Sequence, residues 1–543
     1  YNGNIDMDNC CYIMIDNEHY TVITEAKKTD FKDVKTKRGE MYMDFEARPV
    51  LSLKYYATDE KRVIHPLRDT ICVAYYRDYK TTDWKKKVFT TNNTERSALQ
   101  FMEFMRKQAR DGKHYNVFAH NGANFDYYLL LSVMKDWQIE QSKITTRGLS
   151  LICINYCSHC FKDTCCFLTN SLDNLCKNYK VKNPKKTEFV LRGETLTSKN
   201  LCFYKPNLDF DDFMNLQITE PDYWFEYVDY CYYDCVSLSQ VWGTFCQSMN
   251  TVLQEMSNKV PNATTALMSK CKVMNNITVG GLAKKMLEAL NSKNSKFMFY
   301  QKFIGKDESK YQFIKLFKRG GISHCNQAGK HNESVVSFDI TSQYPSAMIY
   351  MKIPAGNSEW VEEYDPKLYG YYRIKNLTLK GKKFRPIAYS CGGESLNWSK
   401  NWKEEDELYV GSELLKYMLK IEPFEFEVVE GLVSNSYVKG EQLFGAYVNT
   451  LFAEKAKEDV YKSNKDDRYN PAYREVIKLL LNSVSGKLVE DPDRFKTLKV
   501  VAQDNAKNTM NGCGVSMERN EESKMNKWIG AGYCVYDYSK ILL

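Results

Sequence analysis

The chain has 543 residues, of which 43% are hydrophobic, and a formal net charge of +8 at pH 7. A chain of this length can bury two or more hydrophobic cores. It contains 18 cysteines without a regular framework, no 18-residue apolar run and no signal-like segment, which argues against secreted and membrane classes. We expect a soluble protein without a membrane partner in a reducing intracellular compartment. The host cytoplasm is favoured, and the nucleus and the mitochondrion are left open.

The first half of the chain carries acids in a pattern that suits metal-dependent hydrolysis. Residues 1–40 are polar, with one expected strand over residues 11–15, and residues 41–249 alternate between strand and helix patterns. Asp44 and Glu46 lie two residues apart on a predicted strand, so their side chains face the same way. Asp126 is a third acid, and Asp234 is a fourth on a predicted helix. Four carboxylates can bind two divalent metals, one activating water and one stabilising the leaving oxygen of a phosphodiester.

A cysteine-rich segment in the same half offers a second type of metal ligand. Cys157, His159, Cys160 and Cys165 could hold zinc. However, residues 152–167 read as two strands with a short turn, and the adjacent residues 165 and 166 would then point to opposite faces of a strand. We therefore favour a structural interpretation of this cluster.

The second half begins after a mainly helical connector over residues 250–330. The hydrophobic run of residues 335–338 ends in Asp339, which a turn with Ser342 and Tyr344 follows. An acid at the end of a buried strand can hold Mg²⁺ while the backbone N–H groups of the turn face a triphosphate. The alternative is an acid that only caps the next helix.

A helical segment further on carries Arg474, Lys478 and Asn482 at spacings of four residues. These side chains share one face of a helix. Two cations and an amide on one stripe suit a triphosphate whose charge must be neutralised during in-line attack. The alternative is a solvated basic stripe on an amphipathic helix.

Together these segments resemble the family B DNA polymerases. Residues 339–345 match the DxxSLYP motif of that family, and residues 478–486 match KxxxNSxYG. The segments that contain Asp44, Asp126 and Asp234 match the exonuclease motifs DxE, NxxxFD and YxxxD. The resemblance implies an α/β fold, with an RNase H-like 3′–5′ exonuclease domain over residues 41–249, followed by an α+β palm and fingers domain over residues 331–543.

The resemblance also implies an activity and its residues. It implies a DNA-directed DNA polymerase with a proofreading 3′–5′ exonuclease that uses Mg²⁺ or Mn²⁺ at two-metal sites. Its partners would be a DNA template, a primer strand and deoxynucleoside triphosphates. The implied catalytic residues are Asp44, Glu46, Asp126, Tyr230, Asp234 and Asp339, of which all but Tyr230 would bind metal. The implied substrate-binding residues are Asn121 and Phe125 in the exonuclease, and Ser342, Tyr344, Arg474, Lys478, Asn482 and Gly486 in the polymerase.

Three features resemble the protein-primed branch of the family, which replicates phage, viral and linear-plasmid genomes. An insertion is expected at about residues 355–435, including residues 391–394, and a second at about residues 489–527. Arg319–Gly321 resembles the YxGG linker of that branch. The resemblance implies a terminal protein as a further partner.

The chain also departs from the family pattern. Lys318 replaces the linker tyrosine, Ser485 replaces the tyrosine of NSxYG, and either Asn121 or Asn124 could contact the single strand. No YxDTDS motif occurs, and Asp537 is only a faint echo of it. We therefore expect the sequence to stop before that motif, without the thumb and the last palm strands. The alternatives are a stand-alone exonuclease whose polymerase half only binds DNA, and a non-catalytic replication scaffold.

Overall fold

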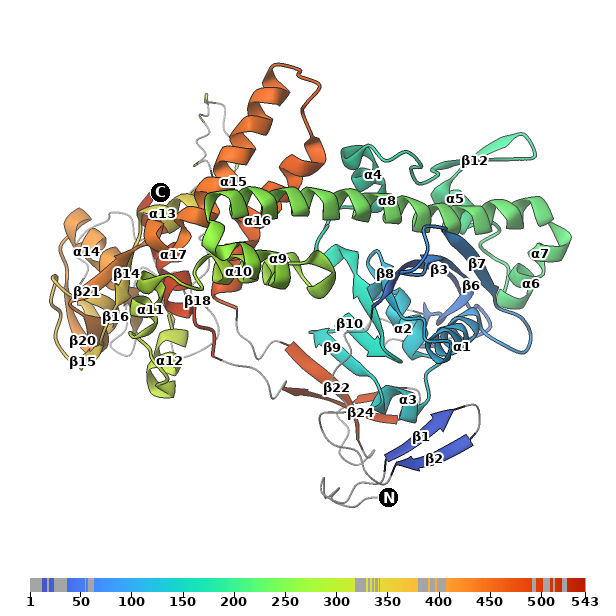
Figure 1. Ribbon diagram of the computed structural model, residues 1–543, viewed down its shortest axis with the longest axis horizontal. Coiled ribbons are helices and arrows are strands. Elements are labelled where there is room, and N and C mark those ends of the chain that lie inside the picture. The colour runs from blue at the N-terminus through green and yellow to red at the C-terminus, as the bar shows by residue number, and fades with distance from the viewer. Residues whose placement is uncertain are drawn as a thin grey trace.

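The structure is a computed structural model. It describes residues 12–16, 19–23, 37–53, 55–56, 63–317, 329–330, 333–334, 336, 340, 342–378, 389–390, 396–397, 407–490, 495–501, 508–510, 513–519 and 525–542. Figure 1 shows one half that contains the larger sheet and another half that combines helices with a smaller sheet, and the long helix α8 (Pro221–Lys259) runs along both.

A ten-stranded sheet forms the first half, in the order β23-β24-β22-β9-β10-β11-β8-β3-β6-β7. Strand β3 (Gly39–Pro49) is antiparallel to β6 (Leu67–Arg77) and parallel to β8 (Tyr115–Ala119). The neighbouring strands are β7 (Lys85–Thr90), β9 (Lys143–Arg147), β10 (Ser150–Tyr156) and β11 (His159–Asp163).

Hydrophobic side chains cover both faces of strand β3. Met41, Met43 and Phe45 enter a core with α1 (Ser97–Arg110) and α2 (Asp126–Leu131), whereas Tyr42 enters the core that contains α8 and α4 (Leu172–Tyr179). Side chains alternate along a strand, so Asp44 and Glu46 lie on the Tyr42 side, toward α8.

Several short elements surround this sheet. They are β1 (Tyr12–Asp16), β2 (His19–Ile23), β4 (Tyr55–Tyr56), β5 (Val63–Ile64), η1 (Gly122–Asn124), α3 (Asp136–Glu140), η2 (Thr164–Cys166), β12 (Glu188–Leu191), β13 (Glu194–Thr197), α5 (Ser198–Cys202), α6 (Phe210–Met214) and α7 (Leu216–Thr219). The single strand expected over residues 11–15 is therefore one arm of the hairpin formed by β1 and β2.

Helices connect the two halves in the described part of residues 250–317. Helix α8 continues to Lys259 and passes without a break through residue 249, which is the predicted end of the exonuclease domain. It is followed by η3 (Pro261–Ala263), α9 (Thr264–Lys270), η4 (Val273–Asn275), α10 (Val279–Leu290), α11 (Ser295–Gln301) and α12 (Glu308–Lys315). The domain limits stay a prediction.

The second half combines a small sheet with a projecting helical hairpin. The sheet has the order β15-β20-β16-β19, and α15 (Gly440–Ser463) and α16 (Pro471–Leu488) form the hairpin at the top of Figure 1. The remaining elements are α13 (Gln343–Tyr350), β14 (Lys352–Ala355), β15 (Glu359–Val361), β16 (Tyr369–Thr378), β17 (Tyr389–Ser390), β18 (Leu396–Asn397), β19 (Leu408–Gly411), α14 (Ser412–Ile421), β20 (Glu425–Ser434), β21 (Ser436–Lys439) and α17 (Ile529–Leu542).

The strands after α16 return to the first half. Strand β22 (Phe495–Val501) pairs antiparallel with β9, with Phe495 opposite Arg147, and β24 (Cys513–Arg519) and β23 (Asn508–Met510) extend the sheet further. The side chain of Leu498 is buried in the core that contains Ile144 and Leu151. The expected second insertion therefore includes three strands of the first half's sheet.

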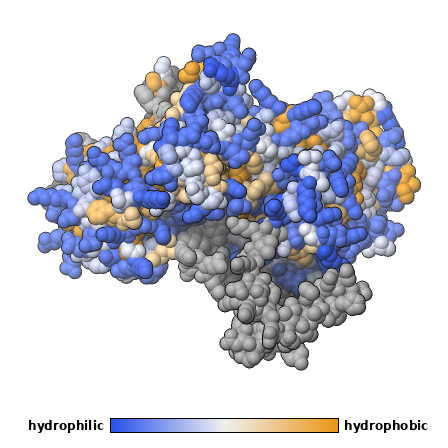
Figure 2. All heavy atoms as spheres, viewed as in Figure 1, coloured by the Kyte–Doolittle hydropathy of each residue, from blue (hydrophilic) through white to orange (hydrophobic). Residues whose placement is uncertain are grey.

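Within the ranges described above, no helix combines the length and the apolar character needed to cross a membrane. The face in Figure 2 is mostly hydrophilic, and its hydrophobic side chains lie in small scattered groups.

Candidate active sites

Three separate segments bring four acids together beneath α8. Asp44 and Glu46 lie on β3, Asp126 is the first residue of α2, and Asp234 lies on α8. The Oδ1 atom of Asp126 accepts a hydrogen bond from the N–H of Phe45 at 3.0 Å, which ties the third acid to the strand between the first two. The sequence-predicted carboxylates therefore form one cluster.

Burial raises the pKa of every acid in this cluster. It raises the pKa of Asp44 well above its usual value, and burial together with the charge of Asp234 raises that of Glu46 to about 8. Burial also raises the pKa of Asp126 to about 7 and, against the nearby Lys185, that of Asp234 to about 6. Crowded buried carboxylates of this kind are stabilised when cations bind.

Lys185 is a functional candidate that the sequence did not single out. Its Nζ atom donates to Asp234 Oδ2 at 2.6 Å and to the Tyr230 hydroxyl at 2.7 Å. Burial lowers the pKa of Lys185, but Asp234 outweighs this effect and the net pKa is raised. The adjacent Lys186 pairs with Asp229 instead, so the sequence alone carried no signal that would separate the two lysines.

The two asparagines that the sequence left open form a bonded pair. Asn124 Nδ2 donates to Asn121 Oδ1 at 2.8 Å, and Ser150 Oγ donates to Asn124 Oδ1 at 2.6 Å. Asn121 adopts a left-handed φ of 67°, and its N–H donates to Asp163 Oδ1 at 2.9 Å. Asp163 is a buried acid that the sequence reasoning missed, and it fixes the loop that carries Asn121 and Phe125.

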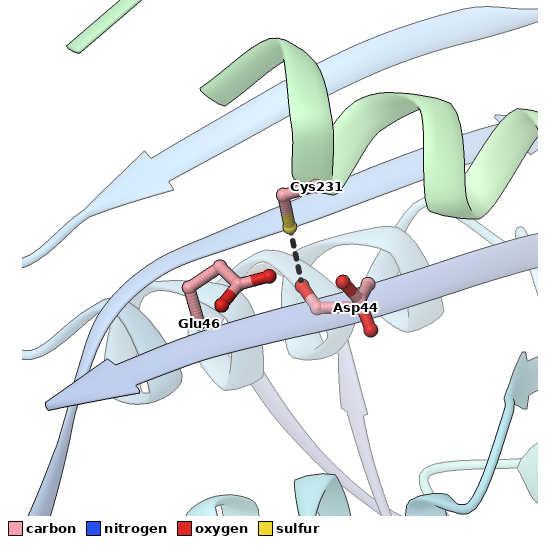
Figure 3. Close-up of side chains that lie close together, drawn as sticks. All are labelled: Asp44, Glu46 and Cys231. Atoms are coloured by element: carbon pink, nitrogen blue, oxygen red, sulfur yellow. Dashed lines mark hydrogen bonds between the residues drawn. The ribbon is translucent and has the colours of Figure 1, made fainter. Parts of the chain in front are cut away.

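Among the described residues, one group of metal-ligating side chains lies close together. It consists of Asp44, Glu46 and Cys231, whose donor atoms lie within 4.8 Å of one another (Figure 3). The cysteine-rich segment forms the expected hairpin of β10 and β11. Both ring nitrogens of His159 are engaged by backbone groups, Tyr115 N–H at 3.1 Å and the Met105 carbonyl at 2.9 Å.

One expectation for the cysteine segment is wrong. Cys165 and Cys166 lie in the 3-10 helix η2 rather than on a strand. The reason is that the preceding Asp163 side chain accepts from Cys165 N–H and caps a helical turn.

In the second half, the predicted nucleotide-binding residues share helix α16. Asn470 caps this helix and Pro471 follows it, which is a favourable start. Lys478, Asn482 and Gly486 are exposed along one stripe, and a Cβ atom at Gly486 would meet nothing within 4 Å. The face is therefore open, as a binding surface requires.

Arg474, at the start of that stripe, already has an anionic partner. Its Nε atom donates to Asp459 Oδ1 on α15 at 2.6 Å, and Lys455 lies 3.5 Å from the same carboxylate. The structure thus joins cations from both helices of the hairpin around Asp459, which the sequence reasoning did not single out.

The acid-bearing turn of the second half is described only in part. Ser342 has a left-handed φ of 51° and occupies the N-cap position of α13, and the Tyr344 ring contacts Tyr536 at a centroid distance of 5.4 Å. Ser485 is buried and its Oγ donates to the Asn482 carbonyl at 3.1 Å. The remaining predicted features lie outside the described residues, namely Asp339, Lys318, Arg319–Gly321 and residues 391–394.

Asp537, the faint echo of the second palm acid, lies on helix α17. Its Oδ2 atom accepts a hydrogen bond from Gly411 N–H at 3.0 Å, and Lys540 lies 3.9 Å away. The structure therefore gives this carboxylate a role in attaching α17 to β19.

An α/β domain with a buried carboxylate cluster, followed by a palm-like sheet and a helical hairpin, is the architecture of a polymerase that carries an exonuclease domain. Residues 107–530 match the family model of DNA polymerase type B, organellar and viral. The chain belongs to this family.

Curated relatives and solved structures agree with this assignment. The chain is 24% identical over 466 residues to a probable DNA polymerase of Ascobolus immersus, covering 78% of this chain and 34% of that protein. A probable DNA polymerase of Neurospora intermedia is 22% identical over 451 residues, covering 75% of this chain and 42% of that protein. The chain thus spans less than half the length of these relatives.

The fold is similar to that of Phi29 DNA polymerase. The orthorhombic crystal form of that enzyme matches with a TM-score of 0.56, and its complex with single-stranded DNA matches with 0.57. Both are 15% identical and cover 92% of this chain, and 76% and 75% of the Phi29 chain respectively. The predicted fold class is confirmed.

Proposed function

We propose that this chain is a DNA-directed DNA polymerase with a 3′–5′ proofreading exonuclease, and that Asp44, Glu46, Asp126 and Asp234 form the exonuclease site. The observation that carries the exonuclease proposal is the convergence of four carboxylates from three segments, of which Asp126 and Asp234 are buried and Asp44 and Glu46 are half-buried. Among the described residues, the buried Oδ1 atom of Asp234 has no hydrogen-bond partner. Lys185 pairs with Asp234, and burial still raises the pKa of each of the four acids. This donor set fits hard divalent cations.

Each residue of the cluster has a distinct proposed task. Mg²⁺ or Mn²⁺ held by the four acids would supply the charge that activates water and stabilises the leaving 3′ oxygen. Tyr230 is held by the Lys185 ammonium at 2.7 Å, so its hydroxyl is oriented toward the same centre. Asn121, Asn124 and Phe125 lie on the loop that leads into α2 at Asp126, and they would position the last nucleotides of a single strand.

Digestion of DNA tests the exonuclease half. Purified protein with Mg²⁺ or Mn²⁺ should shorten single-stranded DNA from its 3′ end, and the double change Asp44→Ala, Glu46→Ala should abolish this activity. Glu40→Ala is the matched control, because Glu40 lies on the same strand but pairs with Arg77 at 3.3 Å. Undiminished digestion by the double variant would remove the assignment.

The polymerase half is supported by the exposed stripe on α16. Arg474, Lys478, Asn482 and Gly486 would contact the triphosphate, with Ser342 and Tyr344 on the other side and Asp339 as a metal ligand. Phi29 DNA polymerase has been crystallised with primer-template DNA, and we propose the same class of partner here. A terminal protein as primer is the partner that the protein-primed resemblance adds.

Two measurements separate this proposal from a stand-alone exonuclease. Lys478→Ala should weaken binding of a deoxynucleoside triphosphate to the protein with primer-template DNA. Primer extension beside an Asp339→Ala control reports on synthesis itself. Asp339-dependent synthesis would support the polymerase, whereas digestion without nucleotide binding would support the stand-alone exonuclease.

A further inference from the structure

A buried thiol points into the proposed exonuclease centre. Cys231 follows Tyr230 on α8 and is 0% exposed. Its Sγ atom donates to the main-chain carbonyl of Asp44 at 3.3 Å, and this atom and carboxylate oxygens of Asp44 and Glu46 all lie within 4.8 Å of one another (Figure 3). The proposed hydrolysis uses no sulfur, so the thiol requires a separate explanation.

Two further groups make this a built site rather than a single cysteine beside acids. Cys202 on α5 donates its thiol to Glu46 Oε2 at 3.8 Å and so orients that carboxylate. Asp234 is 9% exposed, and within the described part of the chain its buried Oδ1 atom has no hydrogen-bond partner. An orphaned acceptor thus accompanies two thiols and two carboxylates.

The donor set differs from one that suits Mg²⁺ alone. Mg²⁺ prefers oxygen ligands, whereas thiolate ligands select zinc-like ions. Zinc binds sulfur at about 2.3 Å and carboxylate oxygen at about 2.0–2.2 Å. Donor atoms that already lie within 4.8 Å of one another therefore need shifts of only about 1 Å, which the Glu46 side chain can supply by rotation.

We propose that Cys231, Asp44 and Glu46 form a site for a thiophilic divalent cation of the zinc class, and that this ion inhibits the exonuclease by displacing the hard cations. The inhibition rests on the proposed function, whereas binding of the ion does not. When the ion binds, the S–H bond of Cys231 breaks, the proton passes to solvent and a sulfur–metal bond forms. No electron is transferred.

Cobalt(II) is the probe that reports sulfur ligation directly. It replaces zinc in tetrahedral sites and gives a near-ultraviolet thiolate-to-cobalt charge-transfer band. We expect cobalt added to the metal-free protein to give this band, and Cys231→Ser to lower its intensity by the equivalent of one thiolate. Cys235→Ala is the matched control, because Cys235 is also 0% exposed on the same helix but donates to the Val73 carbonyl at 3.5 Å. An equal band in wild type and Cys231→Ser would overturn the proposal.

A second measurement uses only the wild-type protein and does not depend on folding of the variant. Stoichiometric zinc should protect Cys231 from alkylation under partially denaturing conditions, as read by mass spectrometry of its peptide. Alkylation of Cys231 at the same rate with and without zinc would overturn the proposal.

Inhibition of digestion completes the test. Mutation of a residue that only supports a metal ligand lowers metal affinity by about 10–100-fold. Cys231 is a direct ligand in the proposed site, so its loss should cost at least as much. Cys231→Ser should therefore need at least tenfold more zinc for half-inhibition, relative to its own activity without zinc. If no variant digests DNA but the cobalt band depends on Cys231, the proposed function fails and the site stands. If the protein digests DNA and the cobalt band is the same in wild type and Cys231→Ser, the proposed cation site is wrong and the proposed function is supported.

Discussion

Glu46→Gln should stabilise the metal-free protein at alkaline pH while it removes exonuclease activity. The carboxylate of Glu46 is crowded by burial and by the charge of Asp234, which raises its pKa from 4.5 to about 8. A glutamine keeps the shape of the side chain but carries no charge. The change therefore removes an unfavourable charge together with a proposed metal ligand.

The sign and size of this effect follow from proton linkage. The folded state holds the Glu46 proton more tightly than the unfolded state, so folding stability falls as pH rises from about 4.5 to about 8. Each pK unit corresponds to about 1.4 kcal/mol. For the shift from 4.5 to about 8, the stability gained by removing the Glu46 charge therefore has an upper limit of roughly 5 kcal/mol above pH 8. Because Glu46 is only partly shielded from solvent and Lys185 lies nearby, we expect Glu46→Gln to raise the free energy of unfolding by about 1–3 kcal/mol.

Thermal unfolding in chelator at about pH 5 and about pH 8 measures this gain. A gain of 1 kcal/mol raises the unfolding midpoint of a domain of this size by about 2–4 °C. The Glu46→Gln protein should melt well above wild type at the higher pH and only slightly above it at the lower pH. Glu40→Gln, which breaks the pair with Arg77 on the same strand, should give no gain. Equal shifts at both pH values, or a loss at pH 8, would refute the reasoning.

Three further predictions concern side chains that the structure singled out. Lys185→Met should lower exonuclease turnover by about 100-fold, whereas Lys186→Met, which loses only a pair with Asp229, should have a much smaller effect in the same assay. Asp459→Asn removes the ion pair of Arg474, which is partly exposed and worth up to about 1 kcal/mol. A titration should therefore show that a deoxynucleoside triphosphate binds about fivefold more tightly. Weaker binding would mean that Asp459 positions Arg474. Leu498→Ser should weaken the packing of β22 against the first half's core by about 2–4 kcal/mol and speed hydrogen exchange in β9. Unchanged exchange would show that the pairing of β22 with β9 does not depend on this side chain.

Local spacing was enough to predict several features of the site. Side chains alternate on a strand, so Asp44 and Glu46 had to face the same way once residues 41–46 formed a strand. A spacing of four residues likewise placed Arg474, Lys478 and Asn482 along one face of a helix. The convergence of Asp126 and Asp234 on these acids is a long-range feature, and the sequence predicted it only through its resemblance to a family.

The sequence by itself therefore determined the elements, the order of the motifs and the chemistry of their side chains, because those depend on spacings of a few residues. Only the tertiary structure decided which lysine of residues 177–186 contacts Asp234, that Cys231 points toward Glu46, and that β22 joins β9. These outcomes depend on how apolar faces from distant segments are buried together, and a strand that pairs with a partner some 350 residues earlier carries no local mark of that partner.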